Sequence, residues 1–105
     1  MIYDESALLD ADLHCLIAFL VVHREGGVSR AAECLGVKQP AVSNQLAKLR
    51  ARFGDELFVG KRAWTPTERA DQIAAALAPV FNSLQDAISA LEEAQKENDL
   101  DLRQP

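Results

Sequence analysis

Glycines divide the first half of this chain into short segments. Gly26-Gly27, Gly36 and Gly54 each follow a run whose apolar residues recur with the period of a half-buried helix. Glycine costs about 1 kcal/mol inside a helix and readily adopts the positive φ of a helix end. Each of these positions therefore predicts the end of a helix. At 105 residues, 49% of them apolar, the chain is expected to form one mostly α-helical domain with a buried core.

Three short helices are predicted between these breaks. The first follows Asp12, its predicted N-cap, and the second follows Ser29, the predicted N-cap of a body over residues 30–35. The third opens at Gln39-Pro40, because proline in the first turn loses no helical hydrogen bond. Its predicted inward stripe recurs at helical spacing and consists of Val42, Leu46, Leu49 and Phe53. Before these helices, residues 1–11 are expected to form a loose acidic arm.

A small hairpin and a long helix are predicted to follow. Residues 57–59 and 64–65 are β-prone runs on either side of a basic turn. Thr67 is the predicted N-cap of a helix to residue 96, with a kink at Pro79 and a polar tail over residues 97–105. Its apolar residues form a heptad seam that predicts pairing with a second helix: Ile73, Leu77, Val80, Leu84, Ala87, Leu91 and Ala94.

Several classes of function find little support in the composition. The longest apolar runs, residues 16–22 and 73–78, are too short to cross a bilayer, and the acidic start is unlike a signal peptide. A cytoplasmic protein is therefore expected. Cys15 and Cys34 fit buried reduced thiols, and His14 and His23 have no ligand cluster around them. We expect no metal site, no cofactor and no enzyme activity.

The segment from Gly27 to Arg50 has the order of a helix-turn-helix. A recognition helix enters the major groove by its N-terminus, so its early side chains must reach base edges. Gln39, Ser43 and Asn44 offer amides and a hydroxyl for this purpose, and Pro40-Ala41 offer apolar contact to a thymine methyl. The same helical geometry also occurs in purely structural domains, so spacing alone leaves both interpretations open.

The hairpin adds a second candidate contact. Lys61 and Arg62 at its turn could approach a phosphate or a minor groove, or could simply be a solvated tip. A helix-turn-helix followed directly by a basic hairpin is the order of a winged helix. This order is more informative than either part alone. The predicted fold is therefore a winged helix-turn-helix over residues 12–66 and a dimerising linker helix over residues 67–96.

Linked motifs in this order resemble the DNA-binding region of LysR-type transcriptional regulators. They run from Asp12-Leu13 through Gly26-Gly27-Val28-Ser29-Arg30-Ala31-Ala32 and Gln39-Pro40-Ala41-Val42-Ser43-Asn44-Gln45-Leu46 to Asp55-Glu56-Leu57-Phe58-Val59 and Pro66-Thr67 with Arg69-Ala70. The last portion is most similar to the branch that contains the LeuO and NodD regulators. The resemblance extends from about Asp12 to Ala70 and continues into the linker helix.

The resemblance implies a transcription factor that binds an interrupted dyad in a promoter as a homodimer. It places the positions of Gln39, Pro40, Ser43 and Asn44 near the bases. It places another set near the phosphates, namely Ser29, Arg30, Lys48, Lys61 and Arg62. Lys38 stands where the family has a capping serine, which removes the cap but adds a positive charge. The effector domain of such regulators is not in this sequence, so no small-molecule effector is expected within the chain.

The formal charge of −5 is unevenly distributed along the chain. Residues 1–23 carry −4 and residues 66–105 carry −5, whereas residues 24–65 hold eight bases and four acids, for +4. The binding segment therefore has the opposite sign to its flanks and suits a polyanion. The modest local charge predicts weak non-specific affinity.

Two hypotheses of different classes remain at this stage. The first is a dimeric, sequence-specific DNA-binding module. The second is a protein–protein interaction module that keeps the winged-helix shell, does not bind DNA, and forms mixed dimers with a full-length regulator through the heptad seam. The acidic total, the missing effector domain and the altered wing motivate the second: Gly60 stands where the family has an arginine, and the wing is one residue shorter than in the family.

Overall fold

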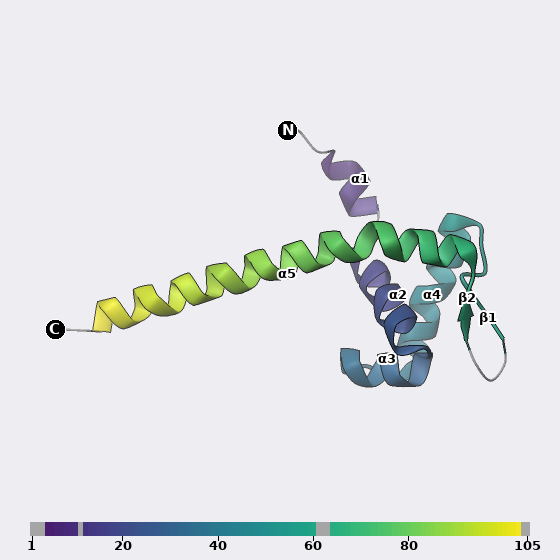
Figure 1. Cartoon of the computed structure of the whole chain (residues 1–105), viewed down its shortest axis with the longest axis horizontal. Helices are drawn as coiled ribbons and strands as arrows, with labels where there is room; N and C mark the ends of the chain where they lie inside the picture. Colours follow the sequence, from purple (N-terminus) through teal and green to yellow (C-terminus); the bar gives the residue numbers. More distant parts are fainter. Residues whose placement is uncertain (1–3, 11, 61–63, 104–105) are drawn as a thin grey trace. The chain divides into compact units, whose positions relative to one another are not determined.

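The computed structural model of the protein describes residues 4–10, 12–60 and 64–103. Its elements follow the order α1 (Glu5–Asp10), α2 (Leu13–Glu25), α3 (Val28–Leu35), α4 (Gln39–Phe53), β1 (Phe58–Val59), β2 (Thr65–Pro66) and α5 (Glu68–Arg103), as Figure 1 shows. Residues 1–74 and residues 75–105 form two compact units. This order confirms the predicted mostly α-helical fold with a hairpin and a long final helix.

The N-terminal segment differs from its prediction. Residues 5–10 form the helix α1 where a loose arm was expected. The carboxylate of Asp4 explains where it begins, because Oδ1 accepts hydrogen bonds from the backbone N–H groups of Ser6 at 2.9 Å and Ala7 at 3.4 Å. A side chain that satisfies these first N–H groups stabilises a helix start even in an acidic, exposed segment.

The glycine positions end the helices as predicted. Gly26, Gly36 and Gly54 all adopt left-handed backbone angles directly after α2, α3 and α4. Asp12 is confirmed as the N-cap of α2, since its Oδ1 accepts a hydrogen bond from the N–H of Cys15 at 3.3 Å. The predicted N-cap of α3 is wrong: α3 begins at Val28, one residue before Ser29, and no side chain caps it.

The core of the first unit lies where α2, α3 and α4 pack against one another. Ala31 is fully buried, and its small side chain lets helices approach closely. The ring centroids of Phe19 and Phe58 lie 5.5 Å apart, so the base of the hairpin joins the same core. The largest fully buried side chains belong to Phe19, Leu46, Leu49, Leu57, Val22, Val42 and Cys15.

The two cysteines lie in different surroundings. Cys15 is buried, and desolvation, more than its hydrogen bond to Asp12, raises the pKa of its thiol to about 11. Cys34 is exposed, so the prediction of a buried thiol there is wrong. The helix α3 buries only Ala31 and Ala32, and Cys34 lies on its uncovered side.

The hairpin is present, with its second strand shifted by one residue. Strands β1 and β2 pair antiparallel, with Phe58 opposite Pro66 and Val59 opposite Thr65, whereas residues 64–65 had been predicted. The predicted turn residues Lys61 and Arg62 lie outside the described part of the chain. The structure therefore defines the base of the wing, and its basic tip stays a prediction.

Thr67 caps α5 as predicted and belongs to a polar junction. Its Oγ1 accepts a hydrogen bond from the N–H of Ala70 at 3.1 Å and donates one to Asp55 Oδ1 at 2.8 Å. The same Asp55 oxygen accepts the backbone N–H of Leu57 at 2.7 Å. These two donors, led by Leu57, hold the pKa of the Asp55 carboxyl below its usual range.

The helix α5 is longer than predicted. It runs to Arg103, whereas a polar tail had been expected from residue 97. The side chains of Gln95 and Asp99, four residues apart, are hydrogen-bonded at 3.0 Å, which supports the helix there. One helix continues through Pro79, as expected, and the kink at that residue stays a prediction.

The lowered pKa of Asp55 gives a testable dependence of stability on pH. The ionised carboxylate stabilises the fold above the ordinary aspartate pKa of 3.8, and this contribution disappears as the pH falls through the lower folded value. In urea unfolding, Asp55→Asn should reduce the free energy of unfolding at pH 7, and its deficit should shrink as the pH falls below 3.8. Asp86→Asn on the exposed side of α5 is the matched control, and a deficit for Asp55→Asn that is independent of pH would contradict the assignment.

Candidate nucleic-acid interface

The helix α4 has one buried face and one exposed face. Val42, Leu46 and Leu49 are buried against the core, at the helical spacing that the sequence predicted. The five residues predicted to contact bases all lie exposed in its first two turns, namely Gln39, Pro40, Ala41, Ser43 and Asn44. Burial of one face therefore presents a continuous surface of amides, a hydroxyl and small apolar groups on the other.

The start of α4 is fixed by backbone geometry and not by a side-chain cap. Lys38 has extended backbone angles and no capping hydrogen bond, as its replacement of a capping residue predicted. Pro40 occupies the first turn. The N–H groups at this helix end therefore remain partly available, and the exposed Lys38 ammonium lies next to them in the sequence. Both features favour an anionic partner.

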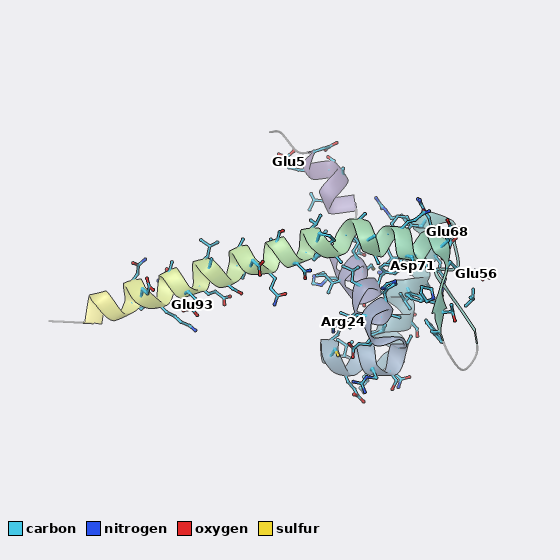
Figure 2. All side chains as sticks on the ribbon, in the orientation of Figure 1. Glu5, Arg24, Glu56, Glu68, Asp71 and Glu93 are labelled. Carbon is cyan, nitrogen blue, oxygen red and sulfur yellow. The ribbon has the colours of Figure 1, made fainter. Side chains whose placement is uncertain are left out.

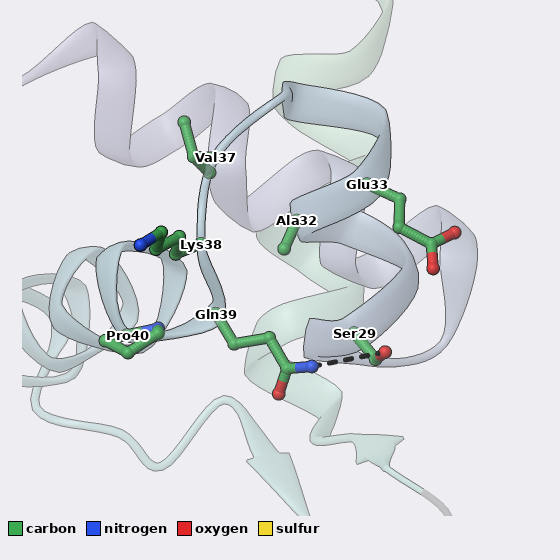
Figure 3. Close-up of a pocket in the computed structure, with 7 residues that line it drawn as sticks. All are labelled: Ser29, Ala32, Glu33, Val37, Lys38, Gln39 and Pro40. Carbon is green, nitrogen blue, oxygen red and sulfur yellow. Dashed lines mark hydrogen bonds between the residues drawn. The ribbon is translucent and has the colours of Figure 1, made fainter.

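The turn between α3 and α4 joins two of the predicted site residues. Gln39 Nε2 donates a hydrogen bond to Ser29 Oγ at 3.4 Å, which Figure 3 shows as a dashed line. These side chains border an open hollow lined by Ser29, Ala32, Glu33, Val37, Lys38, Gln39 and Pro40. The structure thus brings Ser29, Lys38, Gln39 and Pro40 together, as one site would require.

The carboxylate of Glu25, the last residue of α2, contacts two arginines. Glu25 Oε2 lies 2.9 Å from Arg24 Nε, and its Oε1 lies 3.5 Å from Arg30 Nε. Only 18% of the Glu25 side chain is exposed, whereas both arginines are largely exposed. The hydrogen bond from Arg24 is the main reason why the pKa of Glu25 is lowered. Figure 2 labels Arg24, which sequence analysis did not place among the site residues.

Lys48 is the remaining predicted phosphate contact on α4, and it is exposed. Its charge contributes to the lowered pKa of Asp12, although hydrogen bonds from Cys15 contribute more. Lys61 and Arg62, the predicted wing contacts, are not among the described residues.

Arg50 has a structural role that the sequence did not reveal. Its Nε donates a hydrogen bond to the carbonyl oxygen of Glu56 at 2.9 Å, and its guanidinium lies 5.9 Å from the ring centroid of Trp64. The Trp64 ring in turn lies 5.7 Å from the ring of Phe58. Arg50 thereby connects the last turn of α4 to the segment before β1 and to the residue before β2, and these contacts hold the base of the hairpin in place.

No cluster suited to a metal ion occurs among the residues that the structure describes. His23 Nε2 lies 2.8 Å from Asp71 Oδ1, which joins α2 to the first turn of α5. Across residues 4–10, 12–60 and 64–103, no helix combines the length and hydropathy needed to cross a bilayer.

The predicted dimerisation residues divide between the two units. Ile73 is buried in the core of the first unit, and Leu77 is half-buried. In the second unit Val80, Leu84 and Leu91 are 60%, 49% and 70% exposed, and Ala87 is exposed as well. Ile88, 46% exposed, belongs to the same stripe and was missed, because a strict heptad count assigns that turn to Ala87.

Comparison with known proteins assigns the chain to a family. Residues 13–71 match the family of bacterial regulatory helix-turn-helix proteins of the lysR type. The transcriptional regulator LeuO of Escherichia coli is 40% identical over 89 residues, which cover 82% of this chain and 28% of LeuO.

Solved structures agree with this assignment. A protein described as a probable transcriptional regulator of Pseudomonas aeruginosa superposes with a TM-score of 0.74 at 33% identity, over 80% of this chain and 28% of that one. DarR of Vibrio fischeri, solved in complex with DNA, gives a TM-score of 0.65 at 25% identity, over 79% of this chain and 29% of that one.

The chain matches only part of the length of these regulators. The chain spans 28% of the length of LeuO, which is an HTH-type transcriptional regulator. The family match covers the helix-turn-helix, the hairpin and the first turn of α5. The chain therefore belongs to the LysR family of bacterial helix-turn-helix regulators and contains the DNA-binding domain of that family.

Proposed function

We propose that this chain binds an interrupted dyad in promoter DNA as a homodimer, with the N-terminal turns of α4 in the major groove of each half-site. The observation that carries the proposal is the exposed polar surface at the start of α4, with buried Val42, Leu46 and Leu49 behind it. An α-helix with its side chains is about 10–12 Å across, which suits a major groove about 12 Å wide.

The residue types on this surface suit base recognition. The carboxamides of Gln39 and Asn44 can each donate and accept, as an adenine edge requires. The Ser43 hydroxyl can do either, and Pro40-Ala41 can contact a thymine methyl. These five residues are the proposed base-contacting set.

The charge on the same side supports contact with the backbone. Arg30, Lys38 and Lys48 are exposed cations on or beside α3 and α4, and Ser29 adds a hydroxyl. Lysine and arginine at phosphates supply affinity without sequence preference. Lys61 and Arg62 of the wing complete the proposed backbone contacts. DarR, a protein of the same fold, was solved in complex with DNA, which supports DNA as the partner.

The apolar stripe on the second unit supports dimerisation. At 100° per residue, Val80, Leu84, Ile88 and Leu91 fall within an arc of about 80° on α5. Exposed apolar side chains in such a row are typical of a helix that packs against another helix. A two-fold dimer would present two copies of α4 to two half-sites. The same stripe also suits the second candidate, a mixed dimer with a longer LysR-type regulator.

Selection of bound sequences from random duplex DNA tests the base-contacting set. The chain should enrich a dyad at low salt. Asn44→Ala or Ser43→Ala should relax the preference at one position of each half-site, with a loss of discrimination of about 1–3 kcal/mol for a lost bidentate contact. Lys48→Ala should instead weaken binding to all sequences alike and reduce the slope of log affinity against log salt concentration by about 1. Enrichment of no dyad, together with co-purification of a longer LysR-type partner, would favour the mixed dimer and refute the proposal.

Charge placed in the stripe should dissociate the dimer. Leu84→Glu with Leu91→Glu would bury two carboxylates in an apolar contact, so sedimentation equilibrium should show a monomer and dyad affinity should fall at least tenfold. Asn82→Glu with Ser89→Glu adds the same charge on the opposite side of α5 and is the matched control. A double variant that stays dimeric would show that the stripe is not the interface.

A further inference from the structure

One carboxylate oxygen connects the end of α4 to the start of α5. Asp55 Oδ1 accepts the backbone N–H of Leu57 at 2.7 Å and the hydroxyl of Thr67 at 2.8 Å. Thr67 in turn returns its backbone N–H to the carbonyl oxygen of Leu57 at 2.9 Å. Residues twelve apart in the sequence are thereby closed into a ring of hydrogen bonds at the base of the hairpin.

The backbone at this ring is held in an unfavourable conformation. Leu57 has φ of 67°, in the left-handed region, although it is a bulky residue and fully buried. Such a residue is stable only when its surroundings impose the conformation. The bonds from Asp55 and Thr67 impose it here, so the ring fixes the local path of the chain.

The ring is attached directly to the recognition helix. Arg50, in the last turn of α4, donates to the carbonyl oxygen of Glu56 at 2.9 Å. Gly54 closes the same turn by donating its N–H to the carbonyl oxygen of Arg50 at 2.8 Å. A chain of hydrogen bonds therefore leads from α4 through Glu56 and Leu57 to the N-cap of α5.

Two further contacts hold the first turns of α5 in place. The guanidinium of Arg69 lies 5.9 Å from the ring centroid of Phe53, in the last turn of α4. Asp71 Oδ1 lies 2.8 Å from His23 Nε2 on α2. Figure 2 labels Glu56, Glu68 and Asp71 near this end of α5. Because Ala70 and Ile73 are buried between these contacts, the start of α5 has one register against the domain.

We propose that the Asp55–Thr67 contact is a spacing determinant: it positions the first turns of α5 against α4 and so decides how far apart the two half-sites of the dyad may lie. This inference rests on the proposed function. Neither residue is among the proposed base contacts. Their effect would therefore reach the DNA only through the placement of α4 relative to the helix that joins the two subunits.

Half-site spacing is a sensitive measure of this placement. One added base pair moves a half-site by about 3.4 Å and turns it by about 34–36° around the DNA axis. A rigid junction can follow neither change without losing contacts, whereas a loosened junction can follow both. Loss of the contact should therefore broaden the accepted spacings and leave the base preference within each half-site intact.

The test uses duplexes with constant half-sites and the selected spacing changed by one or two base pairs in either direction. The full chain should prefer the selected spacing by about tenfold or more, the scale of one charge-assisted hydrogen bond. Thr67→Val removes the hydroxyl at nearly constant shape, and Asp55→Ala removes the acceptor. Both should flatten the spacing preference to a few-fold, whereas Thr67→Ser, which keeps the hydroxyl, should retain it.

Controls separate this effect from loss of fold and from failure of the proposed function. Asp86→Ala makes the same exchange as Asp55→Ala at an exposed position of α5 and should keep the spacing preference. Circular dichroism at the binding temperature identifies a variant that has unfolded, and the other variant then decides. Variants that retain the full spacing preference would overturn the inference while the dyad itself stands. Equal loss of base preference and spacing preference in the variants would also overturn the inference. A selection in which the wild-type chain enriches no dyad would overturn the proposed function as well.

Discussion

Burial of one face of α4 is the constraint on which the rest of this structure depends. Val42, Leu46 and Leu49 lie almost completely hidden against α2 and α3, where buried Ala31 leaves room for a close approach. Burying side chains of this kind is worth about 1.5–3 kcal/mol each, far more than any single exposed polar contact. The rotation of α4 is thereby fixed, and its polar face must point outward.

The polar contacts of the first unit then fix what the apolar core leaves undetermined. Hydrophobic packing sets which face of α5 is buried, through Ala70 and Ile73, but it is non-directional. The hydrogen bonds at Asp55 and Thr67 have preferred directions and join residues distant in the sequence. Together these two kinds of interaction connect α4, which carries the proposed recognition surface at its start, with the first turn of α5.

Local signals predicted most of the helix boundaries, because glycine and capping residues act within one turn. Asp12, Gly54 and Thr67 are examples that the structure confirms. The prediction of a buried thiol failed at Cys34, because tertiary packing decides burial: the short helix α3 fully buries only Ala31 and Ala32 and leaves Cys34 exposed. The roles of Arg50 and Asp55 could not be predicted either, because their partners are set by the tertiary fold.

The central claim is that the first turns of α4 and α3 face the bases and phosphates. The most direct test is amide NMR of the labelled chain during titration with a duplex that carries the enriched dyad. The largest chemical shift changes should fall on residues 27–31 and 38–44, with small changes at Asn82 and Ser89 on the outer side of α5. Saturating binding that leaves residues 38–44 unperturbed, with changes confined to residues 75–103, would contradict the account.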